Sequence, residues 1–169
     1  MFKCYPHCSY ILEVLISEVI NLEEKILNKE YIMNNGKKFD ENFGYGGDDY
    51  DSFIVEYDQN NNEHLYSGII YDCYENGNIA SYYNVKNGIK SGEMVSFFSN
   101  GQVKEIKHID KNTLEGIQKE FYENGSTKLI EYRTLGRLLG FKKFNETGNL
   151  LEEKPLESDL TNFNELDKR

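Results

Sequence analysis

Three potential metal ligands lie close together near the N-terminus, in Cys4-Tyr-Pro-His-Cys8. A structural zinc ion needs four Cys or His ligands, and a catalytic zinc ion needs at least three in a compatible geometry. The sequence has no second Cys-x-x-Cys or His pair to complete such a site, and His64 and His108 stand alone. We therefore expect an ordinary turn at this segment, and neither a metal ion nor another cofactor.

The side chains of Asp58, Asn60 and Asn62 have the spacing that opens a calcium-binding loop. That loop also requires Gly at its sixth position and Glu at its twelfth. The chain has Glu63 and Ile69 at these two positions. The segment is therefore better interpreted as a solvated hairpin turn.

A glycine-rich stretch, Gly44-Tyr-Gly-Gly47, resembles a phosphate-binding loop only superficially. It lacks the Gly-Lys-Ser/Thr ending of such loops, and the following Asp48 and Asp49 would repel phosphate. The sequence also has no Gly-x-Ser-x-Gly elbow around a nucleophilic serine. Because no distinctive nucleophile or acid–base set stands out, we expect a protein that is not an enzyme. A small hydrolase or lyase with a site in the N-terminal region is an alternative that no residue arrangement supports.

Acidic residues are concentrated in one part of this chain of 169 residues, whose formal net charge is −10. Residues 39–85 contain ten Asp or Glu and no Lys or Arg. Phosphate backbones are bound by Lys and Arg, so this composition argues against nucleic-acid binding. An acidic chain is also poorly suited to anionic lipid surfaces. Since the sequence has no apolar run long enough to span a bilayer and no signal-peptide pattern, we expect a cytoplasmic protein that does not bind membranes.

The acidic segment is the candidate for binding a partner protein. Asp48-Asp-Tyr-Asp51 follows the glycine-rich stretch, and tyrosines are interleaved with its charges. Such charges could steer a basic partner, and the tyrosines could anchor it. A charged loop that only aids solubility would have the same composition. The candidate partner-binding residues are Tyr45, Asp48, Asp49, Tyr50, Asp51, Glu56, Asp58, Glu63, Asp72 and Glu75.

The elements before residue 66 are predicted from local patterns. Apolar residues recur at helical spacing over residues 9–29, and Ser9 is a plausible N-cap. We expect this helix to pack over one end of a sheet as a cap, although a dimerisation or partner-binding helix has the same pattern. Residues 34–51 are rich in Gly, Asn and Asp and are typical of a linker or irregular loop. Residues 52–57 carry a strand signal.

The rest of the chain repeats itself every 24 residues. A period this short indicates a repeat architecture, in which each unit buries its apolar face against its neighbours. Asn-Gly pairs at 76–77, 100–101 and 124–125 suit two-residue hairpin turns. A second set of turns is expected eleven residues after each pair. Two series of glycines carry the period: Gly68, Gly92, Gly116 and Gly140, and then Gly77, Gly101, Gly125 and, one residue early, Gly148.

Apolar and aromatic residues align in columns when the repeats are superposed. Such columns are expected to stack as ladders across neighbouring strands, mostly as core. The last unit is one residue shorter, which is expected of a terminal repeat whose edge must not recruit further strands. The aligned sets are Tyr74, Phe98 and Tyr122; Cys73, Phe97 and Phe121; and Tyr82, Ile106 and Ile130.

The repeat resembles the bacterial variant of the MORN repeat over roughly residues 66–151. The resemblance is carried by Asn87-Gly-Ile-Lys-Ser-Gly-Glu-Met-Val-Ser-Phe-Phe-Ser-Asn-Gly-Gln-Val103 and by the matching segments 66–79 and 114–125. In bacteria this repeat is similar to that of the YwqK-type antitoxin family. The resemblance implies an immunity protein that binds a cognate toxin, and it transfers no catalytic residue. A basic active-site surface on that toxin would complement the acidic segment.

The predicted fold is therefore mainly β. It is an antiparallel meander of 24-residue MORN-like two-stranded repeats with an N-terminal α-helix as a cap. Four segments are expected: 1–38 helical, 39–65 an acidic loop with an entry strand, 66–156 the repeat array and 157–169 a polar tail. A structural or scaffolding repeat protein without a toxin partner is the alternative function.

Overall fold

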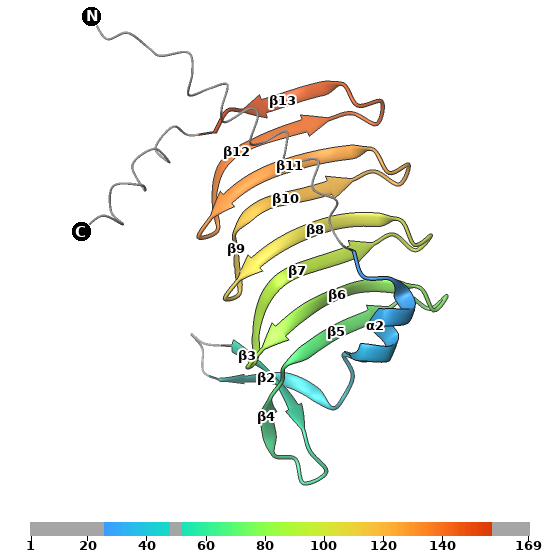
Figure 1. Cartoon of the computed structure of the whole chain (residues 1–169), viewed down its shortest axis with the longest axis vertical. Coiled ribbons are helices and arrows are strands. Elements are labelled where there is room, and N and C mark those ends of the chain that lie inside the picture. The colour runs from blue at the N-terminus through green and yellow to red at the C-terminus, as the bar shows by residue number, and fades with distance from the viewer. Residues whose placement is uncertain (1–25, 48–51, 157–169) are drawn as a thin grey trace, which may run out of the picture.

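The computed structural model describes residues 26–47 and 52–156 as a mainly β protein built on two sheets (Figure 1). Neighbouring strands of the larger sheet pair antiparallel, except that β1 runs parallel to β5. The predicted antiparallel meander is thus confirmed. In spatial order the larger sheet contains β1 (Gly36–Lys38), β5 (Gly68–Cys73), β6 (Ile79–Lys86), β7 (Ile89–Phe97), β8 (Val103–Asp110), β10 (Gly116–Phe121), β11 (Thr127–Thr134), β12 (Arg137–Phe144) and β13 (Leu150–Lys154), with β9 (Thr113–Leu114) paired to β8.

Three-residue loops form the turns at the Asn-Gly pairs, so the prediction of two-residue turns there is wrong. Gly77 N–H donates to the Tyr74 carbonyl at 2.9 Å, and Tyr74 N–H donates to the Asn78 carbonyl at 2.8 Å. Only the glycine of the pair has a positive φ, of 80°. The Asn76 side chain instead accepts the Asn78 N–H at 3.0 Å, and this local hydrogen bond stabilises the three-residue loop.

Two-residue turns occur at the opposite edge of the sheet, where the 24-residue period places the second set. Both central residues have positive φ in the pairs 87–88, 111–112 and 135–136. These left-handed conformations match the twist of the flanking strands. Leu135 adopts φ 48° although it lacks the permissive backbone of glycine.

The segment predicted as a linker, residues 34–51, is largely ordered secondary structure where the structure describes it. It contains β1 and then β2 (Phe43–Gly47), which pairs with β3 (Ser52–Tyr57) and through it with β4 (Glu63–Leu65) in a second, small sheet. The glycines are close-packed strand positions rather than a flexible hinge. A Cβ on Gly44 would lie 2.6 Å from the Tyr57 hydroxyl, so a larger residue there would force the Tyr57 ring to move.

The described helix is α2 (Lys29–Asn35), which begins where the predicted helix was expected to end. Residues 9–25 of the predicted helix lie outside the described residues, and residues 26–28 are not helical. Asn28 caps α2, because its side-chain oxygen accepts the Tyr31 N–H at 2.8 Å. The fully buried Ile32 packs α2 onto the larger sheet. None of the described helices has the length and hydropathy needed to cross a lipid bilayer.

Two core clusters lie on opposite faces of strands β5 to β7, and a third cluster of Ile130, Tyr132 and Leu139 lies on β11 and β12. One face packs against α2 through a cluster that includes Ile32 and Tyr82, and the other packs against the small sheet through a cluster that includes Ile54 and Tyr83. Adjacent residues of one strand point to opposite faces, so the tyrosines at 82 and 83 divide between the two clusters. The predicted column of Tyr82, Ile106 and Ile130 is buried, as expected.

Candidate functional site

Hydrogen bonds between successive repeats hold the turns in register, both in the row that contains the Asn-Gly pairs and in the row at the opposite ends of the strands. At one edge, the Tyr74 hydroxyl donates to the Phe97 carbonyl at 2.7 Å, and the Tyr122 hydroxyl donates to the Phe144 carbonyl at 2.9 Å. Phe98 occupies the same column between the two tyrosines and has no hydroxyl to donate. These bonds fix the aromatic rings at the turn edge, where they border a groove.

We call this groove the acidic groove. It is open on one side, with a cavity volume of about 610 Å³, and combines aromatic rings with more carboxylates than ammonium groups. It lies over the start of β8, the end of β10 and the start of β11, and it includes residues of the turns β7–β8, β10–β11 and β12–β13. The acidic groove is lined by Phe98, Lys104, Glu105, Glu120, Phe121, Tyr122, Glu123, Lys128 and Glu146.

Two of its carboxylates face one another across neighbouring strands. Glu105 on β8 lies directly opposite Glu120 on β10, a like-charge arrangement that is unfavourable by itself. Each is offset by a lysine: Lys107 lies 2.7 Å from Glu105, and Lys128 lies 3.0 Å from Glu120. The hydrogen bond that Lys128 donates to Glu120 raises the pKa of Lys128.

The two turn carboxylates of the groove, Glu123 and Glu146, are exposed and form no ion pair with any residue that the structure describes. Beside them the Lys104 ammonium lies 5.9 Å from the centroid of the Phe98 ring. The two carboxylates suit recognition of a basic side chain, because an unpaired carboxylate attracts a cation and accepts charge-assisted hydrogen bonds from it.

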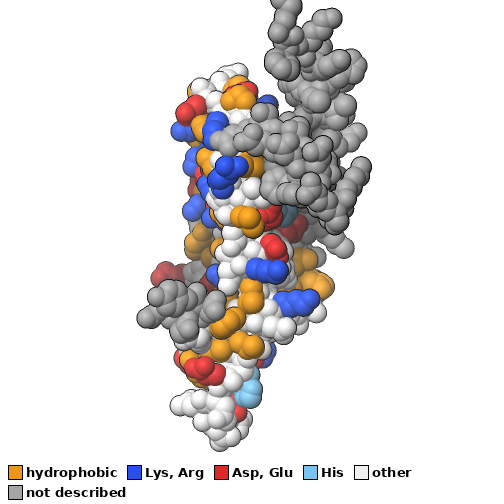
Figure 2. All heavy atoms as spheres, turned by 90° about the vertical axis from the view of Figure 1, so that its left-hand side faces the viewer, with side chains coloured by type: hydrophobic (Ala, Val, Ile, Leu, Met, Phe, Trp, Pro, Cys, Tyr) orange, Lys and Arg blue, Asp and Glu red, His pale blue; other side chains and the backbone are white. Residues whose placement is uncertain are grey.

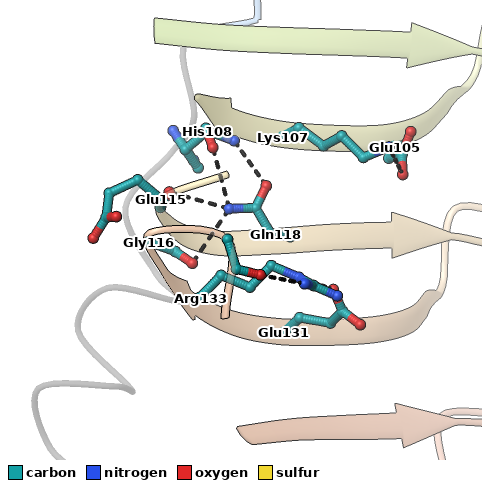
Figure 3. Close-up of polar contacts among 9 residues, drawn as sticks. Glu105, Lys107, His108, Glu115, Gly116, Gln118, Glu131 and Arg133 are labelled. Carbon is teal, nitrogen blue, oxygen red and sulfur yellow. Dashed lines mark hydrogen bonds and ion pairs between the residues drawn. The ribbon is translucent and has the colours of Figure 1, made fainter. Parts of the chain in front are cut away.

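A buried glutamine supports the strands that form the floor of this groove (Figure 3). Gln118 is only 5% exposed and bridges β8 and β10 where their ladder ends. Its Oε1 accepts the His108 N–H at 3.0 Å. Its Nε2 lies within hydrogen-bonding distance of the carbonyls of His108, Glu115 and Gly116, at 3.1–3.3 Å. The amide therefore substitutes for missing backbone pairs and sets the spacing of the two strands.

The residues predicted from the sequence to bind a partner are not gathered into this groove. Asp48, Asp49, Tyr50 and Asp51 lie outside the described residues. Tyr45 lies on β2 and is 61% exposed, with its ring centroid 5.8 Å from that of Phe39.

Two of the predicted carboxylates are engaged within the chain. Glu56 pairs with Lys37 and raises the pKa of that lysine. Asp58 accepts hydrogen bonds from the backbone of Asn60 and Asn62, from the Asn62 amide and from the His64 ring, at 2.8–3.1 Å. These bonds hold the pKa of Asp58 well below its usual range. The segment is a hairpin turn between β3 and β4, as predicted.

The remaining three predicted carboxylates lie far apart in the fold. Glu63 is exposed on β4, Asp72 lies on β5 opposite Ser81, and Glu75 is exposed in the turn between β5 and β6. Figure 1 shows β4, the lowest strand of the small sheet, at the lower left and the β5–β6 turn at the right-hand side. These side chains therefore form no single patch.

The sequence does not reveal the acidic groove, because its aromatic residues fall in the columns that are expected to form the core. Its acids also lie in the part of the sequence where bases and acids balance. The available signal was the exposed position of Glu123 beside Tyr122 in a repeated turn, since a turn side chain outside the apolar columns points to the surface.

No protein-family model matches this chain, and no curated protein matches it either. Within residues 26–47 and 52–156, no group of three or more His, Cys, Asp or Glu side chains could hold a metal ion. The segment Cys4–Cys8 lies outside the described residues.

Proposed function

We propose that this chain is a cytoplasmic immunity protein that binds a cognate bacterial toxin and neutralises it by protein–protein contact. Its hairpins would be MORN-like units, as the 24-residue sequence pattern suggests. The observation that carries the proposal is the open acidic groove, which presents exposed carboxylates beside aromatic rings.

The groove suits the basic surface of a protein that acts on nucleic acid. A lysine or arginine of such a partner would pair with Glu123 or Glu146, and the rings of Phe98 and Tyr122 would pack against its aliphatic stem. Exposed charges at the rim accelerate association and give salt-dependent binding. The acidic segment around Asp48 would add to the same long-range attraction.

Co-expression with the product of the neighbouring gene tests this function. We expect a stoichiometric complex that a pulldown recovers and that weakens as salt rises. A neighbour that is neither toxic nor bound would refute the proposal.

Charge-neutral variants locate the contact. The double variant Glu123→Gln/Glu146→Gln should weaken the complex, whereas Glu30→Gln/Glu153→Gln, which removes the same charge from exposed sites on α2 and β13, should not. Replacing Asp48, Asp49 and Asp51 by Ala tests the acidic segment separately, and unchanged affinity would remove these residues from the interface.

The exposed end of the larger sheet favours a scaffolding role as the second candidate. Leu150 and Leu151 on β13 are 50% and 59% exposed, and the described residues pair β13 only with β12. A strand with an open edge can add a strand from another protein. Light scattering over a range of concentrations would show self-association if this edge recruits a second copy, and a constant monomer mass would argue against that form of scaffolding.

A further inference from the structure

A second groove lies at the other end of the larger sheet, between the small sheet and the turns 87–88 and 111–112. We call it the lysine groove. Its cavity volume is about 570 Å³, and Figure 2 shows this side of the molecule, where hydrophobic side chains gather in the lower half beside basic ones. The residues that matter below are Phe53, Ile54, Ile89, Lys90, Lys111 and Asn112.

Backbone hydrogen bonds fix the two walls of the lysine groove to each other. Ile54 of the small sheet donates its N–H to the Gly88 carbonyl at 2.8 Å and accepts the Tyr66 N–H at 3.1 Å. Asn112 bonds Lys90 twice: its N–H donates to the Lys90 carbonyl at 3.0 Å, and its Oδ1 accepts the Lys90 N–H at 2.8 Å. The groove is therefore preformed, and a ligand would not have to order it.

The two lysines of this groove have no counter-charge among the described residues. Lys37, Lys107 and Lys128 each pair with a glutamate, but no described carboxylate pairs with Lys90 or Lys111. The Lys90 ammonium instead lies 4.4 Å from the centroid of the Tyr83 ring, and burial lowers the pKa of this lysine. A half-buried ammonium that is not paired with a carboxylate is partly desolvated, so an anionic ligand would stabilise it.

We propose that the lysine groove binds a carboxylate that a partner protein carries beside an apolar side chain. The carboxylate would lie between Lys90 and Lys111, and the apolar group would pack on Phe53, Ile54 and Ile89. An apolar wall with two cations fits one carboxylate better than a nucleic-acid backbone, since the net charge of −10 opposes a polyanion. The inference rests on the proposed function in that the partner would be the same toxin, which would then contact two grooves of opposite charge.

A small probe tests the site without the toxin. Amide chemical shifts of the full chain would be followed by NMR during titration with N-acetyl-L-phenylalanine and, separately, with N-acetyl-L-phenylalaninamide, which lacks the carboxylate. We expect shifts at residues 52–54, 89–90 and 111–112, with roughly tenfold weaker binding of the amide. Equal binding of the two compounds, or shifts elsewhere, would overturn the proposal.

Matched variants assign the charge. Lys90→Gln and Lys111→Gln should each weaken binding of the acid, whereas Lys104→Gln, which removes a lysine from the acidic groove, should leave it unchanged. Should Lys90→Gln fail to fold, Lys111→Gln decides alone, because its side chain is exposed. Tighter binding of inorganic phosphate than of the acid would overturn the choice of ligand.

Two further outcomes separate this inference from the proposed function. The triple variant Asp48→Asn/Asp49→Asn/Asp51→Asn gives the first outcome. If this variant binds the probe and the unchanged chain does not, carboxylates of the chain itself occupy the lysine groove, which would overturn the proposal. A toxin complex that persists unchanged in Lys90→Gln/Lys111→Gln would refute the lysine groove as a contact while leaving the immunity function in place.

Discussion

The backbone N–H of Gly88 donates to the carbonyl of Tyr66 at 2.7 Å. The same bond recurs one repeat later, from the Asn112 N–H to the Lys90 carbonyl at 3.0 Å, and once more from the Gly136 N–H to the Leu114 carbonyl at 2.9 Å. The second residue of each two-residue turn is thus tied to a carbonyl at the same earlier place in the repeat, that of Tyr66, Lys90 or Leu114. An inserted or deleted residue would break this bond, which is a physical reason for the 24-residue period.

Gly88 should be the least replaceable glycine of these turns. A Cβ there would lie 2.9 Å from the Phe53 Cβ and 3.1 Å from the Ile54 carbonyl, in a backbone with φ 78°. Gly88→Ala should lower the free energy of unfolding by about 3 kcal/mol, as strain and steric clash add. Gly136→Ala is the control, because its φ is 77° and its nearest atom lies 3.5 Å away, and it should cost about 1 kcal/mol. Urea unfolding measures both, and equal losses would contradict the close approach of the small sheet.

The Tyr122 hydroxyl should contribute to stability through its bond to the Phe144 carbonyl. Tyr122→Phe removes one hydrogen bond between repeats and should cost about 1 kcal/mol in urea unfolding. Tyr31→Phe serves as the control, since Tyr31 is 48% exposed and its hydroxyl has no bond with a described residue, and we expect no measurable change. A similar effect of the two variants would argue against a stabilising hydrogen bond between the Tyr122 hydroxyl and the Phe144 carbonyl.

Asp58 should make the stability of the small sheet depend on acid pH. Its pKa lies below the ordinary 3.8 because Asn62, His64 and Asn60 donate to the carboxylate. A depressed pKa contributes stability above the unfolded value, and that contribution is lost as the pH falls through the folded pKa. Asp58→Asn should therefore flatten the fall in unfolding free energy between pH 5 and pH 2. An unchanged pH profile, followed by NMR signals of β3 and β4, would show that the turn does not stabilise the charged form.

The repeat array could be predicted from the sequence because its determinants are local and periodic. The place of the turn at Asn87 and Gly88 follows from the period, and buried Tyr82 and Ile106 follow from aligned columns. The small sheet could not be predicted in this way. Gly44 is close-packed against Tyr57, and glycine as a flexible linker and glycine under a neighbouring ring look alike in sequence.

The two grooves depend on register across strands that local patterns do not determine. Glu105 and Glu120 become neighbours because β8 pairs with β10 in the same register that β6 has with β7 one repeat earlier, where Ser81 lies opposite Ser96. Lys90 and Lys111 line the same groove, and the bonds from Asn112 to the Lys90 backbone hold the two strand ends side by side. Such contacts arise from tertiary hydrogen bonds, so the sequence indicated the charges of the chain but not the surfaces on which they meet.

Gln118 should be the most sensitive polar residue of the array. Met94 occupies the same place one repeat earlier, so Gln118→Met keeps the volume and suits the fold while removing the amide. The variant would remove the Oε1 that accepts the His108 N–H and the amide group that bonds the carbonyls of Glu115 and Gly116 in a buried place, which should cost about 3 kcal/mol. Gln102→Met, at an exposed turn position, should change stability by less than about 0.5 kcal/mol.

Because β8 and β10 form the floor of the acidic groove, hydrogen exchange of these strands should quicken in Gln118→Met and not in Gln102→Met. Unchanged exchange at a reduced unfolding free energy would mean that Gln118 stabilises the sheet as a whole rather than the spacing of these two strands.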